Sequence, residues 1–562
     1  LKHDLLRPVF SILKRHRHTP AVDLMVPLAT AAYVLVLATL VACAVYALLL
    51  SVLAERKRRD AGVAETADYF ITARGTVGPW LLAFSFFAGA MGSWVTTAPA
   101  NYASAAGLLG LSAYACAAGA PIVAVAYIGG LARLADPDAS SLPDFLRRRF
   151  GSESSGGHGV AVAVLASLLI LFNMVVALLA EYATLGSLFR VYVGASGFMA
   201  ALPIVMMALL TMSYTSAGGL IVSIYTDRVQ AASSLMLCAG LIIYLFCFNA
   251  PEGGLPTLTT EQAGWTYAGF SSLLTMPLSL LASTVFSEAV WQRVWASESN
   301  GTLKFAAWLG GAFVTLVVFF FGFIGFLALW TGRASVGKTD PDLFFFAFFS
   351  DREEAHLDSI PGLMALICAA LMSEGAADSM QNGITATLSS TLLDGQPLWK
   401  TRSLVLAVNV PLAIIGATPA VSSVLQLFLV SNLVCVGAFL PIVAAMLPCA
   451  LLRRLVTEGA VVLGCLCGWL GLSVYGCVLE RSWLAGLRMA WLDNNYGHDY
   501  FLAASGSSVL GLALGCACCY PALSNPARSK GHILSWDSAC DESSSGDDCS
   551  SSSEFEQVHL DS

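Results

Sequence analysis

The chain has 562 residues, of which 57% are hydrophobic and only 12% are charged, and its mean hydropathy is +0.73. Soluble domains carry roughly 25% charged residues, so this composition excludes a soluble enzyme and predicts an all-α polytopic membrane protein. The net charge of −8 says little about partners, but no basic stretch is interleaved with aromatic residues, so we do not expect a nucleic-acid partner. No metalloprotease, phosphate-loop or serine-hydrolase motif is present, so we expect neither catalysis nor a cofactor.

Thirteen apolar segments follow one another along the chain. A membrane-spanning helix needs about 20 mostly apolar residues, and each segment meets this length closely enough. The predicted spans are 24–53, 78–102, 108–134, 159–187, 192–214, 228–249, 267–288, 304–330, 358–386, 402–420, 422–450, 458–479 and 500–522. The first run is long and lacks a clear cleavage site, so we do not expect a signal peptide.

The orientation follows from the Lys and Arg residues of the connections. One side of the predicted bundle carries 18 of them and the other carries 6. We therefore expect the first side, with the C-terminus, to be cytoplasmic and the N-terminus to be outside, although the N-terminal stretch LKRHRH is itself basic. The tail from residue 523 onward is rich in Ser and acidic residues, and we expect it to be disordered.

The second span contains FSFFAGAMGSWVTTAPANY, which has the composition of a broken helix. Gly89 and Gly92 weaken the helix, Pro99 removes a backbone donor, and several hydroxyl side chains follow. A broken helix frees carbonyl groups that can coordinate ions at the middle of the bilayer. The alternative is that the small residues only allow close helix packing.

The seventh span, WTYAGFSSLLTMPLSLLASTVFSEAVWQR, has Pro277 at its middle. Two proline-interrupted helices that lie five spans apart indicate an inverted repeat. The predicted organisation is an N-terminal segment (1–23), a leading helix (24–53), a first five-helix repeat (78–249), a second inverted five-helix repeat (267–450), two trailing helices (458–522) and the tail (523–562).

The ninth span carries two carboxylates, Glu374 and Asp378, which lie four residues apart and hence on one helix face. Ionisable residues inside a membrane are costly and usually functional. We interpret them as a site for a cation or a proton, with Glu374 as the coupling group. Two alternatives are open: a structural pair hydrogen-bonded to Gln381, Asn382 or Ser431, or a helix that ends early and leaves Asp378 in cytoplasmic water.

The stretch MSYTSAGGLIVSIYTDRVQ (residues 212–230) resembles the sodium:solute symporter family in its Tyr-Thr, Gly-Gly-Leu, Thr-Asp and Gln elements. The stretches DYFITARGTVGPW, SLPDFLRRRFG and VWQRVWASES resemble the family as well, in the same order. The resemblance covers about residues 25–450. It implies a LeuT-like core of two inverted five-helix repeats and cation-coupled uptake of a small solute.

The resemblance also implies a cation site between the second and ninth helices. Its predicted ligands are Ala88, Met91, Ala370, Ser373 and Glu374. The family aspartate on the inner cation path falls on Asp227, and we place Asp378 beside it. Glu374 stands where the family usually has a second hydroxyl, so the coupling ion is Na⁺ or H⁺. The urea/polyamine branch, which includes proton-coupled members, is the most similar in NYASAAGLLGLSAYACAAGA.

The family's solute site lies between the second, third, seventh and eleventh helices. The predicted solute contacts are Ser93, Trp94, Thr97, Tyr114, Ser283, Thr284 and Asn432. Nearly all are neutral hydrogen-bonding groups, which favours a neutral solute such as urea, although Trp94 and Tyr114 fit ordinary helix packing equally well.

The resulting hypothesis is a symporter of the plasma membrane whose partners are a small polar solute, the lipid bilayer and cytoplasmic regulators of the tail. The alternatives are a solute sensor and a passive channel on the same fold.

Overall fold

The computed structural model describes residues 21–60, 66–151, 159–248, 255–350, 355–392, 396–418 and 424–523. Within these ranges the chain is helical, and a single isolated bridge between Val77 and Ser297 is the only pairing of extended backbone. The predicted N-terminal segment before Ala21 and the tail beyond Leu523, with the regulators expected to bind it, lie outside the described residues.

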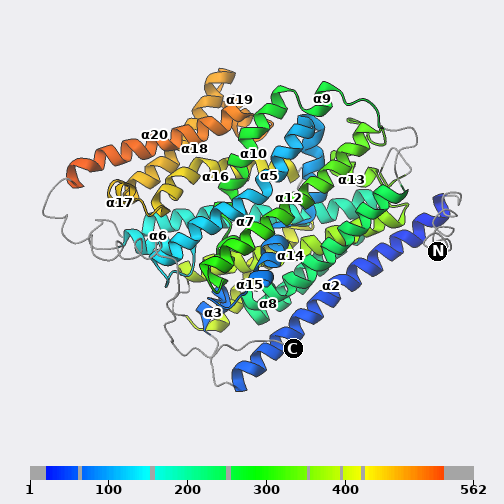
Figure 1. The fold of residues 1–562 in the computed structure, drawn as a ribbon, viewed down its shortest axis with the longest axis horizontal. Coiled ribbons are helices and arrows are strands. Elements are labelled where there is room, and N and C mark those ends of the chain that lie inside the picture. The colour runs from blue at the N-terminus through cyan, green and yellow to red at the C-terminus, as the bar shows by residue number, and fades with distance from the viewer. Residues whose placement is uncertain are drawn as a thin grey trace.

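Eleven helices in the described part of the chain are long and apolar enough to cross a membrane (Figure 1). They are α2 (Ala21–Asp60), α5 (Ala98–Ala135), α7 (Val160–Ser187), α8 (Phe198–Phe248), α10 (Tyr267–Val285), α12 (Asn300–Trp330), α14 (Ile360–Leu392), α15 (Leu398–Gly416), α16 (Val424–Met446), α18 (Glu458–Glu480) and α20 (His498–Leu523). The protein is therefore a multi-pass membrane protein.

Shorter helical elements join these spans. They are α3 (Ala67–Thr72), α4 (Pro79–Ala90), η2 (Ser93–Thr96), α6 (Leu142–Phe150), η4 (Leu188–Tyr192), α9 (Thr260–Ala263), α11 (Glu288–Ala296), η5 (Pro341–Leu343), α13 (Phe344–Ala347), α17 (Ala450–Leu455), α19 (Trp483–Arg488) and η6 (Met489–Asp493).

The helix α8 contains most of two predicted spans, and α5 contains the third predicted span together with the end of the second. α5 is interrupted at Gly107 (φ 66°, ψ −166°) and α8 at Gly219 (φ 60°, ψ −154°). Both conformations lie in the region that glycine adopts readily, and a side chain at Gly219 would overlap with Phe70. The short helix α4, with η2 and the first part of α5, forms the second predicted span, so the thirteen predicted segments correspond to thirteen observed ones.

The prediction that Pro277 interrupts the seventh span is wrong, because α10 continues through Pro277 to Val285. The chain leaves the helix instead at Phe286 (ψ 28°) and Ser287 (ψ 100°), before α11 begins. Side chains satisfy the carbonyl groups freed there: Asn173 donates to the carbonyls of Ser283 and Phe286, and the Trp291 indole donates to that of Val285. A break in a helix is stable where such donors are available. At Pro277 the helix loses only one hydrogen bond, so α10 can continue without donors from other helices.

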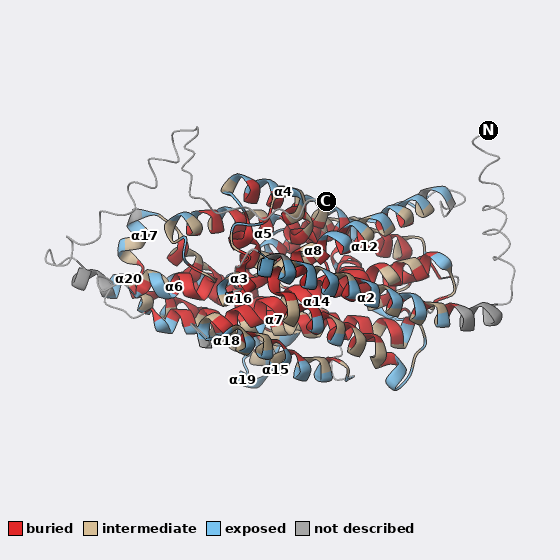
Figure 2. Cartoon of the chain, turned by 90° about the horizontal axis from the view of Figure 1, so that it is seen from below, coloured by how far each residue is buried: buried red, intermediate tan, exposed pale blue. Residues whose placement is uncertain are grey.

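The helix α14 occupies the middle of the bundle. In its most apolar stretch 83% of the residues are buried, against 28% for α2, which lies at the periphery. Figure 2 shows α14 and α7 as largely buried helices, with the exposed faces on the outer ones. The two acidic residues of α14 therefore face protein and not lipid.

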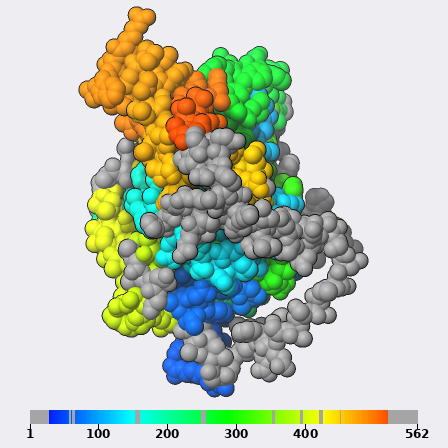
Figure 3. Space-filling view, turned by 90° about the vertical axis from the view of Figure 1, so that its left-hand side faces the viewer, coloured from blue at the N-terminus to red at the C-terminus, as the bar shows by residue number. Residues whose placement is uncertain are grey.

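A short amphipathic helix, α6, lies at the end of the molecule seen in Figure 3. Its N-terminus is capped by Ser141, which accepts from the N–H of Asp144. The Asp144 carboxylate in turn accepts from the N–H of Ser140 and from the guanidinium groups of Arg147 and Arg148 at 3.0–3.1 Å. Burial opposes ionisation of Asp144, but the Ser140 N–H and the Arg148 guanidinium outweigh it and lower the pKa of this carboxyl group.

Asp144→Asn should lower the free energy of unfolding at neutral pH by about 2 kcal/mol, because hydrogen bonds to a charged group are lost. A carboxyl group whose pKa is lowered by folding stabilises the folded state at pH values above the pKa of that group in the unfolded chain, which is roughly 4. This stabilisation is lost as the pH falls through the lower folded pKa. Thermal unfolding in detergent between pH 7 and pH 3 should therefore show a smaller acid destabilisation for the variant than for the original protein; equal slopes would contradict the assignment.

Candidate functional site

The predicted break in the second span is present between α4 and η2. α4 ends at Ala90, and the next two residues are extended (Met91 φ −96°, ψ 117°; Gly92 φ −124°, ψ −178°) before η2 starts at Ser93. Pro99 lies in the first turn of α5, where a missing N–H costs no helical hydrogen bond. The local sequence therefore produces two half-helices separated by an extended dipeptide.

The ninth predicted span, α14, passes directly beside this break. The hydroxyl groups of Ser93 and Ser373 are 3.4 Å apart. A Cβ atom added at Gly375 would lie 3.4 Å from the carbonyl oxygen of Ala88. The structure thus brings together the two segments that supply the five predicted cation ligands, and all five of these residues are buried.

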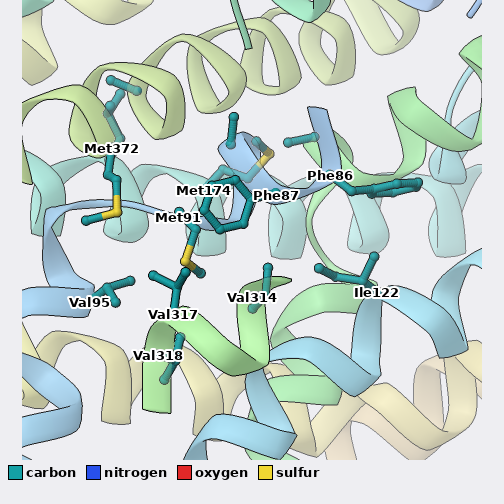
Figure 4. Close-up of a cluster of buried hydrophobic side chains, with 14 of the residues drawn as sticks. Phe86, Phe87, Met91, Val95, Ile122, Met174, Val314, Val317, Val318 and Met372 are labelled. Carbon is teal, nitrogen blue, oxygen red and sulfur yellow. The ribbon is translucent and has the colours of Figure 1, made fainter. Parts of the chain in front are cut away.

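The apolar side of the break is packed by side chains from three other helices. Figure 4 shows Met91 and Val95 of the broken helix next to valines of α12, Met174 of α7 and Met372 of α14. The polar contacts at the break are made by other residues of two of these helices, Glu181 of α7 and Ser373 of α14.

The side chain of Glu181, on α7, reaches the break and was not anticipated from the sequence. Its Oε2 atom accepts from the backbone N–H of Ser93 at 2.7 Å and from the Ser93 hydroxyl at 2.8 Å. The side chain is fully buried, and its Oε1 atom has no hydrogen-bond partner among the described residues. A lone carboxylate within the apolar run LLAEYATL was the available signal, because such residues usually have a function.

Gly92 is required by this contact, since any Cβ atom there would overlap with the Glu181 carboxylate. We expect Gly92→Ala to lower the free energy of unfolding by about 2–3 kcal/mol, because a buried carboxylate can shift only by giving up its hydrogen bonds. The measurement is thermal unfolding of the purified protein in detergent. Gly459→Ala is the control, since nothing lies within 4 Å of its added carbon; similar losses for both variants would contradict the contact.

Glu374 lies against α2 and α8, next to Cys43 and Gln230. Both of its carboxylate oxygens are buried and have no hydrogen-bond partner among the described residues, and the same holds for the amide oxygen and nitrogen of Gln230. Since unpaired buried charge is expensive, this carboxylate needs a proton or a cation.

Asp378 lies one turn further along α14 and faces α8. It accepts from Tyr214 at 2.9 Å and from Thr226 at 3.4 Å. The partners named in the structural alternative are not the ones observed: Gln381 donates to Thr211 and Tyr182, Ser431 donates to Asn173, and the Asn382 side-chain nitrogen has no partner among the described residues. The alternative in which the helix ends early is also wrong, because α14 continues to Leu392 and Asp378 is fully buried.

A buried ion pair lies between the break and α11. Arg293 of α11 contacts Asp227 of α8 at 2.9 Å, and both side chains are at most 2% exposed. The guanidinium also donates to the hydroxyl of Ser379 and to the backbone and side chain of Ser85. Ser379 donates to Asp378 as well, so one network joins α4, α8, α11 and α14.

A cavity of about 160 Å³ lies next to the break. Five of the seven predicted solute contacts line it, namely Trp94, Tyr114, Ser283, Thr284 and Asn432. Ser93 and Thr97 do not line it: Ser93 binds Glu181, and the Thr97 hydroxyl donates to the Trp94 carbonyl. The lining also includes Asn173, Phe428 and Tyr496, which the sequence did not indicate.

The buried charges in the spans and at their ends do not balance. Among the described residues, the fully buried carboxylates there are Glu181, Asp227, Glu288, Glu374 and Asp378, and the one fully buried cationic side chain is Arg293. Isolated charges in a low-dielectric interior are strongly unfavourable. The interior therefore has to take up protons or cations, which is the property that a coupling site needs.

Comparison with known proteins places this geometry in context. The model of the sodium:solute symporter family matches residues 69–295. The chain is 27% identical over 376 residues to the spermidine transporter DUR31 of Candida albicans, which covers 65% of this chain and 67% of that protein. It is 31% identical over 201 residues to solute carrier family 5 member 4B of Mus musculus, covering 34% of this chain and 28% of that protein.

Among solved structures, a Na⁺-coupled sialic acid symporter in a substrate-bound outward-open state aligns with a TM-score of 0.63 and 18% identity, over 87% of this chain and 98% of that one. This likeness shows the LeuT-like fold. The family match spans α3 to α11 and includes the broken helix, Asp227 and Arg293. Over residues 69–295 the chain is therefore similar to the sodium:solute symporter family.

Proposed function

We propose that the protein is a secondary active symporter that couples the entry of one small polar solute to a cation gradient by alternating access. The observation that carries this proposal is the contact between the break of α4 and η2 and the helix α14, beside a cavity of solute size. Freed backbone carbonyls, a serine hydroxyl and buried carboxylates at one point form the ligand set of a cation in such folds.

The coupling cation would bind between Ala88, Met91, Ala370, Ser373 and Glu374. The family name points to Na⁺. Glu374 makes H⁺ an alternative, because a carboxylate with two unpartnered oxygens binds a proton as readily as a metal ion. Asp378 and Asp227 would form the inner path, which the network of Arg293 closes.

The solute would lie in the cavity. Its described lining holds no charged side chain, while Asn173, Ser283, Thr284 and Asn432 offer neutral polar groups. Such a lining favours a neutral solute with amide-like hydrogen bonding, such as urea, because an ion would lose its hydration without a counter-charge.

A polyamine is the second candidate solute. One relative is a spermidine transporter, and aromatic rings surround the cavity, with the Trp94 ring centroid 6.0 Å from that of Phe428 and 6.2 Å from that of Tyr114. Aromatic faces attract ammonium groups.

Release of the solute toward the side of α11 requires the Arg293 network to separate. Gly89 lines the cavity, and a side chain there would overlap with the Arg293 guanidinium. The ion pair thus lies directly behind this wall. We propose that this side is cytoplasmic, in agreement with the positive residues of the connections, and that the membrane is the plasma membrane.

Reconstitution of the full chain into liposomes tests the proposal. Uptake of urea, acetamide, putrescine and spermidine is measured under an imposed Na⁺ gradient, an imposed pH gradient, and neither. We expect concentrative uptake of at least one solute that requires one of the two gradients. Uptake that only equilibrates would indicate a passive channel, and binding without uptake would indicate a sensor; either result would overturn symport.

A further inference from the structure

The second half of the broken helix begins with free backbone donors. η2 starts at Ser93 and continues through Thr97 into α5, so the chain stays helical up to the turn at Gly107. The first N–H groups of a helix have no partner within it, and the helix dipole adds partial positive charge there. In transporters with discontinuous helices, such an N-terminus points at the anionic group of the substrate.

In this chain the donors are already bound by the protein itself. The Glu181 carboxylate accepts from both the N–H and the hydroxyl of Ser93, and the backbone amide of Trp94 and the hydroxyl of Ser373 also face it. Gly92 has no side chain and so leaves room for this carboxylate, which an added Cβ atom would overlap.

The carboxylate lies at the border of the solute cavity. Asn173 and Ala177 of α7 line the cavity, and Glu181 follows one turn later on the same helix face. Trp94, the neighbour of Ser93, is a lining residue as well. Ser93 and Glu181 thus lie directly behind lining residues of the cavity, with the first donors of the helix taken up by the carboxylate and its Oε1 atom unpartnered among the described residues.

We infer that Glu181 is a specificity residue: its carboxylate stands permanently where the anionic group of a substrate would otherwise bind, so the site rejects carboxylate solutes and accepts neutral or cationic ones. This inference rests on the proposed function and restricts its substrate class. When the solute has no carboxylate, the buried N–H groups at the start of η2 need another acceptor, and Glu181 supplies it.

The test is a gain of carboxylate binding in variants of the full-length protein. Binding is measured as the ligand-induced shift in thermal unfolding of the purified protein, with two matched pairs of probes: acetamide against acetate, and putrescine against 4-aminobutyrate. The variants are Glu181→Ala, which frees the donors, and Glu181→Gln, which keeps the shape and one acceptor oxygen. The control is Thr184→Val on the same helix, whose hydroxyl bonds only to the Ala180 carbonyl.

We expect the original protein and the control to show no shift with acetate or 4-aminobutyrate. Glu181→Ala should bind at least one of these carboxylates at least about tenfold more tightly, the effect of hydrogen bonds to a charged group, and Glu181→Gln should show a smaller gain. If neither variant gains carboxylate binding, if the control gains as much, or if the original protein already binds carboxylates, the inference is overturned. Since this readout needs no ion gradient, its failure is distinct from a failure of symport in liposomes.

Discussion

Glu374→Gln is expected to abolish concentrative uptake and at the same time to stabilise the cation-free protein. The carboxylate is fully buried with both oxygens unpartnered, so its charge is a cost unless a cation or proton is bound. Replacing such a charge by a neutral group of the same shape should raise the free energy of unfolding by about 1–2 kcal/mol. Uptake into liposomes and thermal unfolding in detergent, each with and without Na⁺ and at two pH values, measure the two effects.

The control for this prediction is Thr387→Val, also on α14, because the Thr387 hydroxyl is buried and bonds only to the Gly383 carbonyl of its own helix. It should leave both measurements close to those of the original protein. Uptake by Glu374→Gln with an unchanged dependence on Na⁺ and pH would show that Glu374 does not take part in coupling. The loss of only one dependence would identify the coupling ion.

Arg293→Met should produce the largest loss of stability, about 3–5 kcal/mol, because it leaves Asp227 charged and buried without its partner. The guanidinium also holds Ser85, Ser379 and the Ala289 carbonyl, so four elements lose a common contact. Adding Asp227→Asn should restore part of the loss, since the unpaired charge is then removed. Thermal unfolding of the single and double variants measures both changes.

The ion pair of Arg488 and Asp493 offers a matched comparison at the surface. Its N–O distance is 2.7 Å, but the two side chains are 74% and 39% exposed. Exposed pairs contribute roughly 0–1 kcal/mol, so Arg488→Met should change the unfolding temperature little. Comparable losses for Arg293→Met and Arg488→Met would mean that the buried network does not hold the four elements together.

The sequence was sufficient for features that depend on neighbouring residues. The apolar runs predicted the spans, and Gly92 predicted the break, because the low helix propensity of glycine acts locally. Glu374 and Asp378 were recognised since two carboxylates in an apolar run are costly anywhere in a membrane.

Features that depend on distant residues were missed. Glu181 meets Ser93 across 88 residues, and Arg293 meets Asp227 across 66. The position of the second break followed from Asn173 and Trp291, which satisfy its carbonyls, and not from Pro277. In each case the decisive partner comes from another helix, and only the packing of the helices shows which donors and acceptors meet.

Tyr496 reaches the cavity from the turn between η6 and α20, where Asn495 and Tyr496 both have positive φ values of 50° and 60°. Its hydroxyl donates to the Leu425 carbonyl, and this hydrogen bond holds the turn against α16. Sequence changes in this turn would therefore alter which solute fits the cavity without altering the residues between α4 and α14 that face the coupling ion.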